Sequence, residues 1–268
     1  MNDSGICIVR GERGHLELVT HEARPVQTGE LRDILLALGP DVVAAIDAPL
    51  LVGPGRTAER EVGRHFGRFK ASAHSASAEL LRTTGRDAGP RLAGVLGAAG
   101  FSLDPLAITR EAAGRFAFEV YPHALHVCWF ELNERIRYKR KPQWKVAGSR
   151  EGLRALQRYV RGALAAFAPE LIDPLAPDLA PEATDARGRA LKRLEDRLDA
   201  VTCMLAALRA WREGMRPGDV LGQGLTGYVA VPGLALDCRF GAVHPVGCRH
   251  SHDAEHAREA DLRRLHEP

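Results

Sequence analysis

Long hydrophobic runs are missing from this sequence, since none of its apolar stretches approaches the roughly 20 residues that a membrane-spanning helix needs. Its five cysteines are odd in number and irregularly spaced, unlike the cysteines of a small disulfide-scaffolded domain. The first residues do not resemble a secretory signal. These absences predict a cytoplasmic location without a membrane anchor.

Two common catalytic motifs are also missing. The sequence has no Gly-x-x-x-x-Gly-Lys loop for phosphates, and it has no Gly-x-Ser-x-Gly nucleophile turn. The net charge of +3 is only mildly basic and does not by itself indicate a nucleic-acid partner. The chain is therefore not predicted to be a P-loop enzyme or a serine hydrolase of the elbow type.

The composition is that of a globular protein, with 45% hydrophobic and 26% charged residues over 268 positions. Strands and helices alternate along the chain, which favours an α/β fold. The expected strands are 5–9, 15–20, 42–46, 115–121 and 228–231, and the expected helices are 30–38, 122–132, 152–167 and 188–212. We expect one domain over 1–233 with a helical and loop insertion around 53–112, a Pro-rich irregular stretch over 168–181, and a disordered tail over 234–268.

Asp47 directly follows the apolar run 42–46 and precedes Ala48-Pro49. In open α/β sheets, ligand sites gather at the carboxyl ends of the strands. A carboxylate next to a buried run is costly unless it is paired or bound to a metal ion. We interpret Asp47 as a functional acid, and the alternative is a simple turn residue.

Glu119 lies within Phe118-Glu119-Val120-Tyr121-Pro122-His123, in an alternating strand pattern. A buried strand would place this carboxylate inside the sheet, where a nearby cation would keep it ionised. The alternative is a strand face open to solvent. For His123 two interpretations stay open, a phosphate donor or a cap of the following helix.

Asp196 and Asp199 are three residues apart on the strongest amphipathic pattern in the chain, so their side chains share nearly one face of a helix. Asp199 borders the apolar stripe. Two close carboxylates repel each other unless a cation lies between them. Arg193 and Arg197 offer an ordinary salt-bridge explanation for the pair.

Together, these four acids suggest a catalytic set. Cleavage of a phosphodiester needs an activated water and a stabilised leaving oxygen, and divalent ions held by converging carboxylates supply both. Hard ions such as Mg²⁺ or Mn²⁺ prefer such oxygen ligands. The sequence thus predicts catalytic roles for Asp47, Glu119, Asp196 and Asp199, with Asp47, Glu119 and Asp199 as metal ligands.

The motifs Ile46-Asp47-Ala48-Pro49-Leu50, Glu119-Val120-Tyr121-Pro122-His123 and Asp196-Arg197-Leu198-Asp199-Ala200 resemble those of an uncharacterised family of predicted RNase H-like nucleases. The resemblance extends over roughly residues 5 to 232. It implies a central mixed β-sheet with helices on both sides and divalent-metal phosphodiesterase chemistry. The family normally begins with a strand that ends in Gly-Ile-Asp, and this sequence begins just after that point. The first strand is therefore expected to be truncated, with one metal ligand missing.

Basic residues near the predicted acids are candidates for phosphate or nucleic-acid contacts, although a solvated surface is the simpler interpretation of each. The predicted substrate-binding set is Arg56, His123, Lys139, Lys141 and Arg150. The cysteines and histidines after residue 237 do not have the spacing of a closed zinc site.

Three hypotheses follow. The first is a metal-dependent nuclease, with nucleic acid or a nucleotide as its partner. The second is a non-catalytic nucleic-acid or nucleotide-binding protein of the same fold, because the first-strand ligand is missing. The third is a phosphotransferase related to actin-like ATPases, which share this core. The lack of recognisable phosphate-binding hairpin loops argues against the third.

Overall fold

The computed structural model describes residues 3–12, 15–139 and 146–236. Its strands form three two-stranded sheets. β1 (Ser4–Glu12) pairs antiparallel with β2 (His15–Arg24), and β5 (Val220–Gln223) pairs antiparallel with β6 (Gly227–Ala230). β3 (Val42–Ile46) pairs in parallel with β4 (Arg115–Glu119). The mixed α/β architecture is confirmed, but the expected central sheet is divided into these separate pairs.

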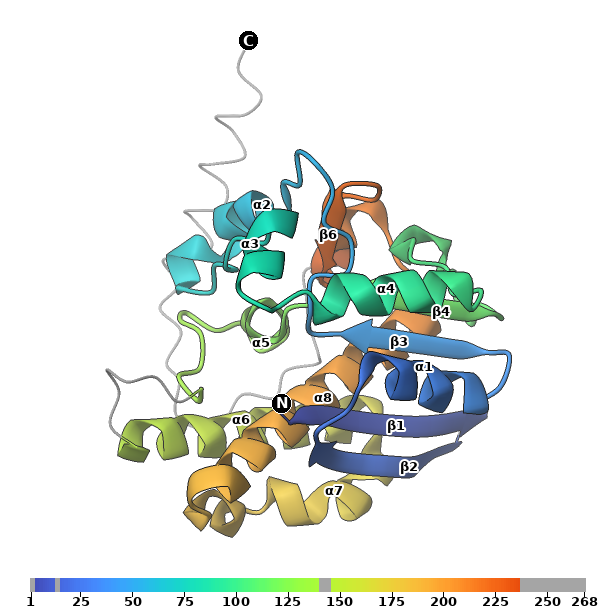
Figure 1. The fold of residues 1–268 in the computed structure, drawn as a ribbon. Coiled ribbons are helices and arrows are strands. Elements are labelled where there is room, and N and C mark those ends of the chain that lie inside the picture. The colour runs from blue at the N-terminus through green and yellow to red at the C-terminus, as the bar shows by residue number, and fades with distance from the viewer. Residues whose placement is uncertain (1–2, 13–14, 140–145, 237–268) are drawn as a thin grey trace.

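Helices surround the strand pairs (Figure 1). The α-helices are α1 (Thr28–Ala37), α2 (Ala58–Phe66), α3 (Ala78–Thr83), α4 (Ala88–Ala98), α5 (Pro122–Trp129), α6 (Val146–Phe167), α7 (Ile172–Leu179) and α8 (Gly188–Glu213). The short 3₁₀ helices are η1 (Gly67–Phe69), η2 (Pro105–Ala107), η3 (Pro169–Leu171), η4 (Pro181–Asp185), η5 (Pro217–Asp219) and η6 (Leu234–Leu236).

The expected elements are present with shifted ends. The strand over 42–46 is confirmed, and the helix expected over 188–212 is α8. The segment 168–181, expected to be irregular, contains the helix α7. Pro174 lies in the first turn of α7, where a missing N–H costs nothing, whereas Pro177 lies inside this short helix and removes one of its backbone donors. The predicted tail begins with η6, and its remainder from 237 lies outside the described residues.

The parallel pair β3–β4 is covered on both faces, which explains its nearly continuous apolar sequence. One face packs in a small core with α1 and α4, through side chains such as Leu35, Leu92 and Leu96. The other face belongs to the main core, to which Phe118 of β4 and Leu198 of α8 contribute. This arrangement places the carboxyl end of β3 against the middle of α8.

The long helix α8 passes behind both β1 and β3 (Figure 1). Its apolar residues recur every three or four positions, and Leu194, Leu198, Val201, Leu205 and Leu208 are all buried. An acid next to this stripe is carried into the interior with it. Within the described part of the chain, no helix is both long and apolar enough to span a membrane.

Candidate functional site

Asp47 lies one residue beyond the last residue of β3. Pro49 disfavours a helical conformation for Ala48, so the chain leaves the strand in an extended turn. The carboxylate borders a cavity that α8 also lines, and 35% of its side-chain surface is exposed. It is therefore open to a ligand from the cavity.

Asp199 comes to the same place from the middle of α8 and is buried. Its Oδ1 accepts a hydrogen bond from the hydroxyl of Tyr138 over 2.6 Å. Its Oδ2 lies 3.0 Å from Nζ of Lys139. Two consecutive residues of the segment before α6 thus hold the two oxygens of one carboxylate.

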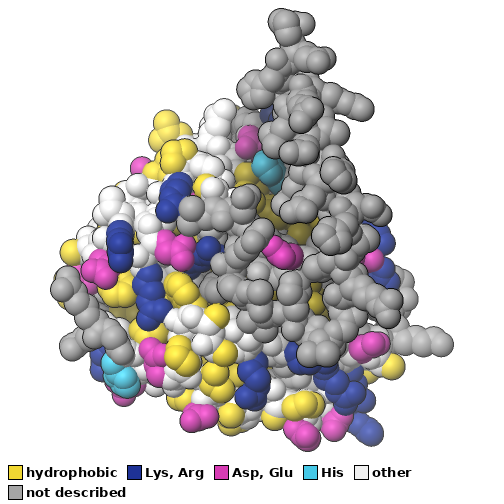
Figure 2. All heavy atoms as spheres, turned by 180° about the vertical axis from the view of Figure 1, so that it is seen from behind, with side chains coloured by type: hydrophobic (Ala, Val, Ile, Leu, Met, Phe, Trp, Pro, Cys, Tyr) yellow, Lys and Arg dark blue, Asp and Glu magenta, His cyan; other side chains and the backbone are white. Residues whose placement is uncertain are grey.

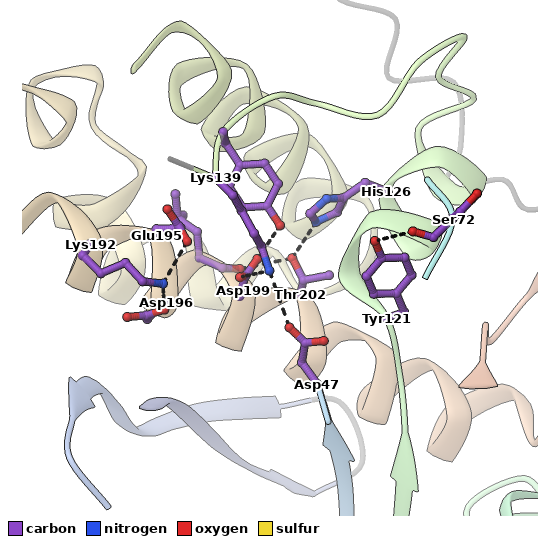
Figure 3. Close-up of polar contacts among 12 residues, drawn as sticks. Asp47, Ser72, Tyr121, His126, Lys139, Lys192, Glu195, Asp196, Asp199 and Thr202 are labelled. Carbon is purple, nitrogen blue, oxygen red and sulfur yellow. Dashed lines mark hydrogen bonds and ion pairs between the residues drawn. The ribbon is translucent and has the colours of Figure 1, made fainter. Parts of the chain in front are cut away.

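Lys139 links the two acids, because its Nζ also lies 3.7 Å from Oδ2 of Asp47 (Figure 3). Burial raises the pKa of Asp47 to about 6, while Lys139 lowers it and Asp199 raises it further. Burial also opposes the charge on Lys139, but Asp199 and Asp47 outweigh burial and raise the pKa of the amine. One cation therefore lies between two carboxylates that come from separate elements.

Asp196 is one turn away from this cluster and has a cation of its own. Its Oδ1 lies 2.5 Å from Nζ of Lys192, which also contacts Oε1 of Glu195 at 2.8 Å (Figure 3). Burial raises the pKa of Asp196, and Lys192 opposes that rise. The two aspartates of the Asp-x-x-Asp motif are thus neutralised by different lysines rather than by the neighbouring arginines. Arg197 instead pairs with Asp178, and Arg193 with Asp3.

Glu119, the last residue of β4, is buried in an ion pair with Arg56. Arg56 donates from Nη2 to Oε1 at 2.6 Å and from Nη1 to Oε2 at 3.1 Å, and the backbone N–H of Leu50 donates to Oε2 at 3.0 Å. Burial raises the pKa of Glu119 to about 7, although Arg56 and Leu50 favour the ionised form. This carboxylate braces the loop after β3 and makes its contacts with Arg56 and Leu50, not with Asp47 or Asp199.

A family model described as "Protein of unknown function (DUF429)" matches residues 2–220. The chain belongs to this DUF429 family. No curated protein matches the sequence, and no solved structure matches it either. The matched range contains the acids around Lys139 and the acids around Lys192. It also contains every residue that the sequence analysis of this DUF429 chain predicts to be catalytic, metal-binding or substrate-binding.

The remaining predicted residues of the DUF429 chain have varied surroundings. His123 is buried, and its ring centroid lies 5.1 Å from that of Tyr138 and 5.6 Å from that of Tyr121. Arg150 donates to the carbonyl oxygens of Asp185 and Ala186. Lys141 lies outside the described residues. Of the predicted phosphate contacts within the described residues, Lys139 is the one that lies at the acid pair.

Sequence reasoning missed Tyr138, His126 and Thr202, which lie beside the acid pair Asp47–Asp199 in this DUF429 protein. Tyr138 is fully buried although it lies in a basic stretch with no apolar periodicity. His126 is also fully buried, and its Nε2 lies 2.9 Å from the hydroxyl oxygen of Thr202. The same hydroxyl lies 3.1 Å from the carbonyl oxygen of Leu198, so it connects His126 to the backbone of α8. The one available signal was the placement of His126 on a predicted helix next to a candidate strand end.

The donor set for a metal ion in the described DUF429 structure consists of Asp47 and Asp199. Among the described residues, no three His, Cys, Asp or Glu side chains come together as a metal-binding group. Two carboxylates still fit Mg²⁺, which keeps several waters and is often bound through one or two carboxylates together with substrate phosphates. Burial and the nearby Asp199 raise the pKa of Asp47 although Lys139 lowers it, so further positive charge at this place would favour the ionised carboxylate.

Proposed function

We propose that this protein is a divalent-metal-dependent phosphodiesterase of the RNase H-like type, with nucleic acid as its substrate. The observation that supports it most is the convergence of Asp47 and Asp199 on one cation, since these acids are 152 positions apart in the sequence and come from a strand end and a late helix. The parallel pair β3–β4 with helices on both faces is compatible with an RNase H-like core.

In this proposal, Asp47 and Asp199 hold Mg²⁺ or Mn²⁺, and Lys139 is the phosphate-binding residue. A bound metal ion would activate a water molecule and stabilise charge on the phosphate oxygens. Lys139 carries a positive charge on a flexible side chain, so it can leave the carboxylates and contact a phosphate oxygen when the metal ion takes its place. Tyr138 holds Asp199 in one orientation throughout, because its hydroxyl bonds the oxygen that Lys139 does not contact.

Glu119 has a supporting role in this proposal. Both of its oxygens accept hydrogen bonds from Arg56, and the backbone of Leu50 holds one of them as well. Its ion pair fixes the loop that begins at Asp47, so it helps to set the position of that carboxylate. Asp196 has its own cation in Lys192 and lies one helical turn from Asp199.

One observation favours the second hypothesis, a protein of the same fold that binds nucleic acid without cleaving it. Lys139 already pairs with both acids, and among the described residues no three His, Cys, Asp or Glu side chains come together as a metal-binding group. The described side chains visible in Figure 2 include both basic and acidic groups.

The test uses the full chain with labelled single- and double-stranded DNA and RNA, in Mn²⁺, in Mg²⁺ and in EDTA. Cleavage is expected only with the metal ion, and Asp199→Asn should abolish it. Asp185→Asn is the matched control, because Asp185 is an exposed aspartate that pairs with Arg154 away from the cluster. Metal-dependent cleavage that survives in Asp199→Asn would refute the assignment of this site. Binding without cleavage in every metal condition would favour the second hypothesis.

A further inference from the structure

Three exposed arginines lie four residues apart on α2 and on the 3₁₀ turn η1 that continues it. They are Arg60, Arg64 and Arg68. Gly67, at the end of α2, keeps helical backbone angles, so η1 extends the helix without a break. A step of four residues returns a side chain to nearly the same face of a helix and advances it by about 6 Å. The three guanidinium groups therefore form one row, which we call the arginine ridge.

The acids of α2 do not neutralise this ridge. Glu59 pairs with Arg56 at 2.7 Å, and both oxygens of Glu61 accept hydrogen bonds from groups outside the ridge. Among the described residues, no carboxylate forms an ion pair with an arginine of the ridge. Its positive charges are therefore available to an anionic ligand.

Local backbone preferences do not explain these cations. Arg60 is in the first turn of α2, where the helix dipole disfavours a positive charge. Lys70, directly after η1, has a left-handed backbone with a φ of 59°, at a position where helix ends favour glycine. Basic side chains thus occupy two places at which helix stability favours other residues.

The loop that follows the ridge reaches the acid pair. The carbonyl of Phe69 accepts a hydrogen bond from the backbone N–H of Arg135 at 2.9 Å. Further along, the carbonyl of Ser72 accepts one from the hydroxyl of Tyr121 at 3.2 Å (Figure 3). Tyr121 follows β4, and Asp47 follows the paired strand β3, so the two residues leave the same edge of the strand pair.

Charges from both directions act on Tyr121. Burial raises the pKa of its hydroxyl, the cations Lys139 and Arg135 lower it, and Asp47 raises it. Lys139 and Asp47 belong to the acid-pair site, whereas Arg135 contacts η1. Tyr121 and Arg135 therefore connect the site to the ridge.

We propose that the arginine ridge is a track for the phosphate backbone of one nucleic-acid strand, and that the substrate is a polymer rather than a nucleotide. The ridge extends over about 12 Å from Arg60 to Arg68, so it can contact successive phosphates. Only a strand of several nucleotides presents one phosphate to the acid pair and others to the ridge. Guanidinium groups on phosphate do not read bases, so binding is independent of sequence. This inference rests on the proposed function, which supplies the point of cleavage.

The test measures binding of labelled oligothymidylate of about 20 nucleotides to the full chain in EDTA, where no metal-dependent cleavage occurs. Changing all three arginines of the ridge to glutamine should weaken binding at least about tenfold. The slope of log Kd against log salt concentration should fall by about 2, because each phosphate contact on a single strand contributes about 0.7. The unmodified chain should prefer this strand to a dinucleotide by at least about tenfold, and the triple variant should lose most of that preference.

The matched control removes three exposed arginines elsewhere, with the same loss of charge, and should leave Kd and slope intact. Its substitutions are Arg110→Gln, Arg158→Gln and Arg161→Gln. Arg64→Gln alone should lower the slope by about 0.7, which keeps the test decisive if the triple variant does not fold.

An unchanged slope in the triple variant, an equal loss in the control, or equal binding of the dinucleotide and the long strand would overturn the proposal. So would displacement of the strand by polyglutamate of equal charge at equal concentration, because the ridge would then fit an acidic polypeptide. The proposed function fails separately. Ridge-dependent binding without cleavage in Mn²⁺ would refute the nuclease and support the track, whereas cleavage that needs Asp199 but no arginine of the ridge would refute the track alone.

Discussion

The hydroxyl of Tyr138 donates to Oδ1 of Asp199, while Nζ of the next residue, Lys139, contacts Oδ2 of the same carboxylate. The phenol is fully buried, so this hydrogen bond is shielded from water. The carboxylate is therefore held in one orientation toward Asp47 even when Lys139 moves. Tyr138 is a positioning residue in the proposed site.

The variant Tyr138→Phe should weaken Mn²⁺ binding by about 10- to 100-fold, the usual effect of removing a hydrogen bond that orients a metal ligand. The measurement is titration calorimetry with Mn²⁺ alone. Tyr228→Phe is the matched control, because it also removes a buried hydroxyl, which donates to the carbonyl of Leu103. If both variants bind Mn²⁺ like the unmodified chain, Tyr138 has no positioning role.

The variant Asp47→Asn should stabilise the protein at neutral pH. The pKa of Asp47 is about 6 in the folded protein and 3.8 ordinarily, so the folded state disfavours its ionised form. This penalty is absent below about pH 4 and complete above about pH 6. Because the side chain is partly exposed, the gain is only about 1 kcal/mol, or roughly 2–4 °C in melting temperature. Melting curves at pH 4 and 7.5 check this. A variant that is less stable than the unmodified chain at pH 7.5 contradicts it.

His126 should make the protein less stable as the pH falls. Burial lowers its pKa to about 4 from the ordinary 6.5, so the stability that depends on its neutral form is present above pH 6.5 and is lost as the pH falls toward 4. At about 1.4 kcal/mol per pH unit, the loss is on the order of 3 kcal/mol. Denaturant unfolding of His126→Gln should show a smaller loss over this range. The exposed residue His74 supplies the control, since His74→Gln should behave like the unmodified chain.

Removal of Arg56 should be strongly destabilising at alkaline pH. Arg56→Met leaves Glu119 buried without its cation, which costs about 3 kcal/mol when the carboxylate is ionised. At pH 5 the cost should be smaller, because the pKa of Glu119 is already about 7 and the acid can stay protonated. Urea unfolding at pH 5 and 8 measures the difference. Arg24→Met, which breaks the more exposed pair with Glu30, should have little effect at either pH.

A double variant separates charge from packing in this pair. Adding Glu119→Gln to Arg56→Met removes the stranded charge and should restore part of the stability at pH 8, with less effect at pH 5. If the double variant is as unstable as Arg56→Met at pH 8, the loss comes from the packing of the arginine side chain, and the ion-pair explanation fails.

Much of the local structure could be predicted from patterns along the chain. The apolar run 42–46 ends at a carboxylate that a following proline keeps outside a helix, and this pattern identified both β3 and Asp47. The three- and four-residue spacing of leucines identified α8, and it placed Asp199 next to the buried stripe. These features depend on neighbours within a few residues, which is the range over which side-chain periodicity carries information.

The pairing of the charges could not be predicted in the same way. Glu119 meets Arg56 from 63 positions away, and Asp199 meets Tyr138 from 61 positions away. The segment that carries Tyr138 and Lys139 has no periodicity, so nothing local shows that it turns inward. The sequence also offered arginines next to Asp196 as its partners, while the folded chain uses Lys192.

The order of residues alone was enough to identify β3, α8 and the acids that border their apolar surface, because these properties arise from near neighbours. Which cation faces which acid was decided only when distant segments packed together. Coulomb attraction depends on distances through space, and only the folded chain sets those distances.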